Sequence, residues 1–266
     1  MIPDIAHLGL LDETELELDA AALELAALDH PNADLAHYVA LLETMSDRLL
    51  THAVAAETPE DQAATLARVF AEELAFEGDR DTYDDPDNAD LIRVLDRRRG
   101  LPIALSLLYV AAARRIGWTA HALNTPGHVL MSVGEERPVL IDPFNRGAPV
   151  QPAQLARLLA ATVGRDGAIP ADHVAPMSNR AVLVRLLTNQ AMRAEAAGDP
   201  VRASVIYERM TTIAPSYSHG WWELARLQVA HGQAGDARDS LSAMLETTRD
   251  PTTRAHVNAA LDALGV

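Results

Sequence analysis

The chain has 266 residues, of which 48% are hydrophobic and only 4% aromatic. Its core must therefore consist largely of Ala, Leu and Val, which favours closely packed helices in one or two domains. The net charge of −16 argues against nucleic acid as a partner, because phosphate binding needs clustered cations. The chain contains no cysteine, which excludes disulfides, thiolate metal sites and a cysteine nucleophile.

The sequence contains no signal for membrane insertion, secretion or cofactor binding. No run approaches the roughly 20 apolar residues of a membrane span, and the first residues lack the pattern of a secretory signal. We therefore expect a cytoplasmic protein with no membrane partner. All 22 basic residues are arginine, which fits a GC-rich bacterial genome. No motif indicates a cofactor, and the oligomeric state is left open.

The N-terminal part predicts three amphipathic helices, over residues 12–28, 34–50 and 58–76. The first opens with an Asp-x-x-Glu arrangement, and the third opens with Thr58 as a cap and Pro59 at its first position. An acidic loop over 77–90 follows. Its spacing lacks the glycine and terminal glutamate of a calcium loop, so we expect a solvated turn.

A short helix is then predicted over 88–99, ending at Gly100, and a longer apolar helix over 100–117. Pro102 suits the first position of this second helix, where no N–H is needed. Strands are expected over 119–123, 129–133 and 139–142, then a helix over 151–163 and a linker rich in Gly and Pro over 164–179. The fold class is α+β: a helix-rich domain with a small antiparallel sheet.

The C-terminal part contains an internal repeat. A shift of 34 residues aligns chemically matching positions, namely Ala191 with Ala225, Gly198 with Gly232, Ala203 with Ala237 and Met210 with Met244. A 34-residue period with small residues at helix contacts resembles the tetratricopeptide repeat, an all-α architecture. We place the domain boundary near Met177, between a first domain over 1–177 and tetratricopeptide-like repeats over 178–266.

The predicted hairpin brings a histidine close to an aspartate. If its apex lies near Gly134, residues whose numbers sum to about 271 or 272 face each other, which puts His128 beside Asp142. An aspartate in this position fixes the tautomer of an imidazole and supports its protonated form in acid–base catalysis. A structural hydrogen bond at the mouth of the hairpin explains the same spacing, and both interpretations stay open.

The order helix start, His, Asp and the stretches "YDDPDNADLIRVLDRRRGLPIALSLLYVAAARRIG", "NTPGHVLMSV" and "LIDPFNRG" resemble the transglutaminase-like superfamily, and within it the bacterial SirB-type proteins with C-terminal tetratricopeptide repeats. The resemblance implies a papain-like first domain. Arg114 and Gly117 set the register, so that His128 and Asp142 match the catalytic pair and Pro102 falls on the cysteine position. A prolyl side chain cannot attack a carbonyl, and proline supplies no N–H to an oxyanion hole.

A hydroxyl is the remaining option for a nucleophile. Ser106 lies one turn after Pro102, about 6 Å along the helix axis, so a Ser106–His128–Asp142 arrangement is geometrically conceivable. A serine within a helix more often bonds a preceding carbonyl, and Tyr109 and Thr125 are weaker candidates. The other nine histidines lack the spacing of a zinc site.

The leading hypothesis is a nucleophile-less transglutaminase-like pseudoenzyme that binds a protein or peptide in a regulatory role. The alternative is a hydrolase or acyl-transfer enzyme in which His128 and Asp142 work with Ser106 or water. A third hypothesis is a regulatory protein that acts through its repeats alone. In the leading hypothesis a groove holds a polar or carboxylate group of the partner, and the residues expected to bind are Arg98, Asn124, His128, Asp142, Asn145 and, on the repeats, Trp222.

Overall fold

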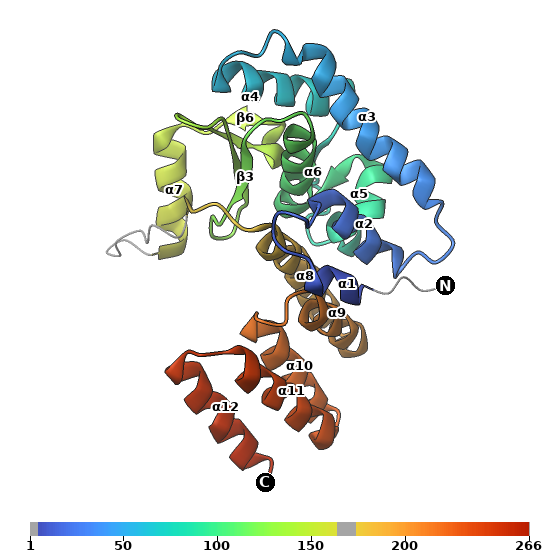
Figure 1. Cartoon of the computed structure of the whole chain (residues 1–266), viewed down its shortest axis with the longest axis vertical. Helices are drawn as coiled ribbons and strands as arrows, with labels where there is room; N and C mark the ends of the chain where they lie inside the picture. Colours follow the sequence, from blue (N-terminus) through green and yellow to red (C-terminus); the bar gives the residue numbers. More distant parts are fainter. Residues whose placement is uncertain (1–4, 164–173, 266) are drawn as a thin grey trace. The chain divides into compact units, whose positions relative to one another are not determined.

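The computed structural model describes residues 5–163 and 174–265 (Figure 1). Their contacts group them into two compact units, one of residues 17–163 and 174–186 and the other of residues 5–16 and 187–265. The division falls within helix α8 (Asn179–Ala196). The domain boundary near Met177 stays a prediction, and residues 164–173 of the predicted linker lie outside the described residues.

Helices dominate the N-terminal part of the first unit, as predicted. They are α2 (Leu18–Ala27), α3 (Leu35–Ala53), α4 (Pro59–Ala67) and the π-helical turn η1 (Arg68–Glu73). Helix α4 begins with the expected capping box, since Thr58 Oγ1 accepts from the Asp61 N–H and the Asp61 carboxylate accepts from the Thr58 N–H.

The predicted start of the first helix was wrong. The Asp-x-x-Glu arrangement closes a single turn, in which the Asp12 carbonyl accepts from the Glu15 and Leu16 N–H groups. The Asp12 N–H donates back to the Glu15 carboxylate. This turn is not continued, and α2 begins at Leu18. A short helix that the sequence did not predict, α1 (Ala6–Leu10), belongs to the second unit and contacts its helix α9 (Pro200–Ile213).

The acidic loop is framed by two short parallel strands, β1 (Glu77–Gly78) and β2 (Arg99–Gly100). Between them lie the 3-10 turn η2 (Pro86–Ala89) and helix α5 (Leu91–Arg97). The helix therefore ends before Gly100. Arg98 terminates it in the left-handed conformation, with φ 57°, a position at which the sequence signal pointed to glycine.

Helix α6 (Pro102–Arg115) is the centre of the first unit. Its first twelve residues, from Pro102 to Ala113, are all buried, which is the pattern of a helix covered on every side. It packs against α2 and α3 and against two strands of the sheet (Figure 1). The start of α6 is thus fixed within the core.

The sheet has the order β3-β4-β5-β6, and every pair is antiparallel. The predicted strands are β3 (Ala120–Leu123), β4 (Leu130–Val133) and β5 (Val139–Asp142); the sequence did not predict the two-residue β6 (Ala148–Pro149). Met131 pairs with Ile141 and Val133 with Val139, which confirms the predicted hairpin register. The 3-10 turn η3 (Pro143–Asn145) follows β5, and helix α7 (Pro152–Val163) follows β6.

The second unit consists of helices whose bounds repeat. Helix α9 spans Pro200–Ile213 and α11 spans Ala234–Thr247, a shift of 34 residues at both ends. Helices α8 and α10 (Ser218–Ala230) end with the same offset, and Gly198 and Gly232 follow them in the left-handed conformation. Helix α12 (Pro251–Ala263) completes the series. The assignment of this region to the tetratricopeptide family stays a prediction.

In the part of the chain that the structure describes, no helix combines the length and the hydropathy needed to cross a membrane.

Candidate functional site

The hairpin brings His128 and Asp142 into direct contact. The Nε2 of His128 lies 2.9 Å from Oδ1 of Asp142, so the two side chains share a hydrogen bond. The same carboxylate oxygen accepts from the Asn145 N–H at 3.2 Å and thereby caps the turn η3. Asp142 is held by the end of β5 and by this cap, so it presents a fixed acceptor to the imidazole.

His128 is oriented with one edge of its ring available. Its side chain is 21% exposed, against 8% for Asp142. With Nε2 donating to the carboxylate, Nδ1 is the nitrogen with a free lone pair, and no described residue hydrogen-bonds to it. The ring of Phe144 meets the imidazole edge to face, at 5.7 Å between centroids. This arrangement can accept a proton or a hydrogen bond from a bound molecule.

The start of α6 carries no nucleophile. Pro102 occupies the first helical position and is buried, and the preceding Leu101 N–H donates to the Asn88 carbonyl. Ser106 is 0% exposed, and its hydroxyl lies 3.5 Å from the Val129 carbonyl. Among the described contacts, Ser106 forms no hydrogen bond with His128. The structure thus brings His128 and Asp142 together but does not join Ser106 to them.

The two weaker hydroxyl candidates are also enclosed. Tyr109 is 0% exposed and stacks on Phe70 at 4.0 Å between centroids, while its hydroxyl has no hydrogen-bond partner among the described residues. Burial raises the pKa of Tyr109. The Thr125 hydroxyl accepts from the Leu130 N–H and is buried at the base of β4. Neither hydroxyl is presented to a ligand.

Arg98, Asn124 and Asn145, which the sequence analysis placed in a common groove, have separate partners. The Arg98 guanidinium donates to the Leu74 carbonyl and lies 4.9 Å from the centre of the Phe76 ring. The Asn124 side chain accepts from Arg185, and the Asn145 side chain accepts from Arg80 at 2.7 Å. Asn145 alone of these three contacts the His128–Asp142 pair, through its backbone N–H.

Trp222 belongs to the second unit, on helix α10, and is 37% exposed. It lines an apolar cavity of about 310 Å³ within this unit. The other lining residues come from α10, α11, α12 and the residue that follows α12, and they are Ala225, Arg226, Val229, Leu241, Ala260, Ala263 and Leu264. Trp222 is therefore the exposed member of the Trp221–Trp222 pair, while the Trp221 indole donates to the Pro215 carbonyl.

Arg114, which served to align the chain with the family motif, connects the end of α6 to β3. Its guanidinium donates to the Ala120 carbonyl and to Asn179, and it contacts Nδ1 of His121. Burial lowers the pKa of Arg114, and burial together with the charge of Arg114 lowers the pKa of His121. Gly117, at φ 85°, then turns the chain into the sheet. These contacts fix the end of α6 relative to β3.

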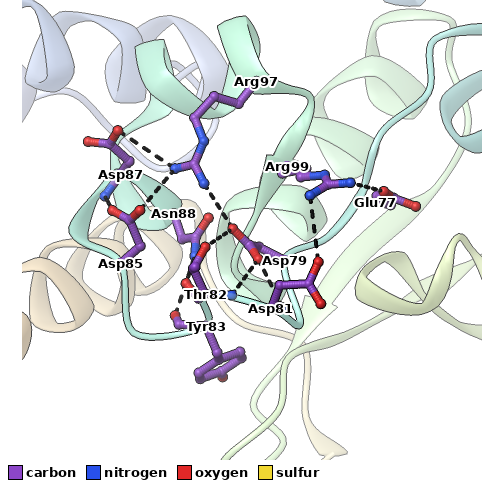
Figure 2. A network of polar contacts seen from close by, with 10 residues as sticks. All are labelled: Glu77, Asp79, Asp81, Thr82, Tyr83, Asp85, Asp87, Asn88, Arg97 and Arg99. Atoms are coloured by element: carbon purple, nitrogen blue, oxygen red, sulfur yellow. Dashed lines mark hydrogen bonds and ion pairs between the residues drawn. The ribbon is translucent and has the colours of Figure 1, made fainter.

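The acidic loop, which the sequence predicted to be a solvated turn, is held by the network of polar contacts that Figure 2 shows. Asp79 is 2% exposed, and its carboxylate accepts from the Thr82 hydroxyl, two backbone N–H groups and Arg97. Buried Asn88 donates to the Thr82 carbonyl from the other end of the loop. Asp85 and Asp87 lie 3.8 and 3.7 Å from Arg97. The tips of the loop are exposed, but its two ends are anchored.

Sequence reasoning missed several residues that contact the predicted site residues. Phe144, Arg80 and Arg185 were not identified, because a single aromatic ring and isolated arginines form no motif. Arg80 and Arg185 contact Asn145 and Asn124, and the sequence analysis had selected these two asparagines. Within the described residues, no group of three or more His, Cys, Asp or Glu side chains is placed to hold a metal ion.

Comparisons with known proteins show the family of the chain. The family described as the transglutaminase-like superfamily matches residues 36–188, more than half of the chain. A UPF0162 protein of Xylella fastidiosa (strain 9a5c) is 28% identical over 254 residues, which are 92% of this chain and 89% of the relative. A UPF0162 protein of Vibrio cholerae is 31% identical over 122 residues, 45% of each chain.

Among solved structures, menin, whose crystal structure is titled as revealing a binding site for Mixed Lineage Leukemia protein, aligns with a TM-score of 0.45 and 13% identity. The alignment covers 91% of this chain and 69% of menin. The family match includes helix α6, the hairpin with His128 and Asp142, and the anchored acidic loop. This chain belongs to the transglutaminase-like superfamily.

Proposed function

We propose that this protein is a transglutaminase-like binding module, without covalent catalysis, that holds a protein or peptide partner in a regulatory role. The observation that carries the proposal is the buried Pro102 at the start of α6, in a chain without cysteine. A thiol enzyme needs its thiolate at this place, where the helix dipole lowers the thiol pKa. With proline instead of cysteine at position 102, the site can still bind a polar group, because the His128–Asp142 pair is formed and His128 is partly exposed.

The second unit supports the proposal with a surface of its own. The cavity beside Trp222 is apolar and open, and aromatic residues in such places are frequent anchors of protein partners. We assign the helices from α8 to α12 to a short tetratricopeptide-like array, and the chain to the SirB-type branch of its superfamily. The cytoplasmic location predicted from the sequence stays a prediction.

A second candidate function is hydrolysis or acyl transfer with water as the attacking group. The orientation of His128 favours it, because Nε2 is fixed by Asp142 and Nδ1 is left as a base. Ser106 contributes little to this candidate, since its hydroxyl is buried and contacts the Val129 carbonyl.

One experiment separates the two functions. The purified protein is incubated with a fluorophosphonate probe and with a panel of acyl esters and peptide amides, beside the Ser106→Ala and His128→Ala variants. The binding module predicts no labelling and no turnover in any of the three proteins. Turnover that His128→Ala abolishes while the variant stays folded establishes the enzyme and overturns the proposal.

Binding is tested directly with a displayed peptide library on the full chain. We expect enrichment of a recurrent sequence on the wild-type protein. Loss of that enrichment in His128→Ala, with the same circular dichroism as wild type, assigns the binding to this site. An unchanged enrichment places the binding elsewhere, and the Trp222→Ala variant then tests the cavity on the second unit.

A further inference from the structure

A polar cleft lies next to the His128–Asp142 pair, within the first unit. Its volume is about 200 Å³. The lining residues come from β1, the acidic loop, β2 and the segment after β5, and they are Glu77, Gly78, Arg80, Asp81, Arg99, Phe144 and Arg146. Phe144 packs so closely on Gly78 that a Cβ at that position would lie 2.4 Å from the ring. The ring and the glycine backbone therefore form a rigid wall of the cleft.

The lining of the cleft carries an excess of positive charge, in a chain whose net charge is −16. Arg99 and Arg146 share one carboxylate, since Glu77 lies 3.0 Å from the first and 3.3 Å from the second. Asp81 lies 3.9 Å from Arg99 and is 87% exposed, so its pairing is weak (Figure 2). Three guanidinium groups thus face two carboxylates, which leaves a single positive charge.

Arg80 supplies this charge. It forms no ion pair with any described residue. One of its terminal nitrogens donates to the Asn145 side chain at 2.7 Å, and its guanidinium lies 5.9 Å from the centre of the Phe144 ring. These two contacts orient the guanidinium and leave its remaining N–H groups available. An oriented guanidinium with free N–H groups matches the geometry of a carboxylate, which accepts two parallel hydrogen bonds.

Two residues connect the cleft with the His128–Asp142 pair. Asn145 accepts from Arg80 through its side chain and donates to Asp142 through its backbone. Phe144 lines the cleft with its ring and meets the His128 imidazole edge to face. A group bound at Arg80 would therefore lie beside the pair and change its surroundings.

We propose that this cleft binds a carboxylate of the partner, with Arg80 as the residue that recognises it. The inference rests on the proposed function and names the chemistry that the partner presents. A carboxylate carries one negative charge and so matches the single excess charge of the lining, whereas a phosphate group carries up to two. The carboxylate belongs either to an acidic side chain or to a peptide C-terminus.

The test uses four short peptides and the full chain. Two are acetylated and amidated, Ala-Glu-Ala and its neutral counterpart Ala-Gln-Ala; two are acetylated Ala-Ala-Ala, with a free or an amidated C-terminus. Nuclear magnetic resonance follows the Gly78 amide, the Asn145 side-chain amide and the His128 imidazole. We expect saturable shifts with one or both carboxylate peptides, which identifies the source, and none with the neutral peptides.

Variants of single arginines assign the effect. Arg80→Gln should raise the dissociation constant by about five- to tenfold, because a charged hydrogen-bond donor is lost at an exposed site. Arg80→Lys keeps the charge but not the fork and should fall between wild type and Arg80→Gln. Arg137→Gln is the matched control, since this exposed arginine of the hairpin turn does not line the cleft. It should bind as wild type does.

Three outcomes overturn the inference: equal shifts with neutral peptides, an unchanged affinity in Arg80→Gln, or tighter binding of inorganic phosphate than of either carboxylate peptide. The binding-module proposal is judged separately, by the displayed library. Library peptides that bind equally to wild type and Arg80→Gln leave that proposal standing while the carboxylate cleft fails. Carboxylate shifts at Gly78 without any library enrichment would support the carboxylate cleft while the binding-module proposal fails.

Discussion

Phe144 places its ring edge-on to the His128 imidazole, with 5.7 Å between the centroids and 87° between the planes. The ring also contacts the acidic loop, because Tyr83 meets it at 5.8 Å and Arg80 lies over it. One side chain thus connects the histidine of the hairpin with a loop that precedes it by some 45 residues. The site is therefore larger than the motif that revealed it.

Removal of the Asp142 carboxylate should destabilise the first unit. Asp142→Ala leaves the His128 Nε2 and the Asn145 N–H, both partly buried, without their acceptor, and the loss of such hydrogen bonds costs about 0.5–1.5 kcal/mol each in typical proteins. Urea denaturation of the variant measures the change. Glu136→Ala, in the exposed hairpin turn, is the control and should stay close to wild type. Equal stabilities of all three proteins would show that the pair contributes nothing to the fold.

Asp79 should make stability depend on pH in the acid range. Burial by itself raises the pKa of Asp79, but the hydrogen bonds from Thr82 and Asn88 and the charge of Arg97 outweigh it, so the pKa lies below its ordinary 3.8. A carboxyl with a depressed pKa stabilises the folded chain above its unfolded pKa, and this contribution is lost as the pH falls through the folded pKa.

The pH dependence is measured by urea denaturation at several values from about pH 6 down to about pH 3. Wild type should lose more stability over this range than Asp79→Asn does, because the variant has no carboxyl to protonate. Asp84→Asn, at an exposed position of the same loop, controls for the change of net charge. A slope in Asp79→Asn as steep as that of wild type would contradict the assignment.

Tyr109→Phe should leave the protein as stable as wild type or slightly more so. The Tyr109 hydroxyl is buried without a hydrogen-bond partner among the described residues, so its removal relieves a desolvation cost of about 1 kcal/mol. The stacking on Phe70 is retained. Tyr207→Phe is the contrasting variant, because it removes a hydrogen bond to Glu195 and should be destabilising. Thermal unfolding compares the two, and a clear loss of stability in Tyr109→Phe would reveal an unseen partner, such as water.

The register of the resemblance predicts what a thiol would do at position 102. Pro102→Cys introduces the single cysteine of the chain at the start of α6, where the helix dipole should outweigh the burial of the position, so the thiol pKa should lie below the ordinary value of about 8.5. Titration of the thiolate absorbance measures this. In Pro102→Cys combined with His128→Gln the pKa should rise again. Ser106→Cys, buried within the same helix, should instead show a raised pKa. If the thiol pKa is the same in Pro102→Cys with and without His128→Gln, the alignment of position 102 with the family's cysteine is wrong.

The sequence by itself determined the elements whose signals are local. The capping residues Thr58 and Pro59 marked the start of α4, and short apolar runs on either side of a turn marked the strands β4 and β5. The turn between these strands fixed their register, and the register brought His128 to Asp142. Local signals were misleading where a turn closed without propagating, at Asp12, and where Arg98 took the left-handed position expected of glycine.

The tertiary structure decided which residues contact the predicted site residues. Arg80 reaches Asn145 across 65 positions of sequence, and Arg185 reaches Asn124 across 61, and no periodicity reports such contacts. Ser106 shares a helix face with Pro102 by spacing alone, but the packing of α6 against the sheet turns its hydroxyl to the Val129 carbonyl. Interactions between residues close in sequence determine helices, caps and hairpins. The neighbours of a side chain depend instead on how these elements pack, and this packing depends on residues throughout the chain.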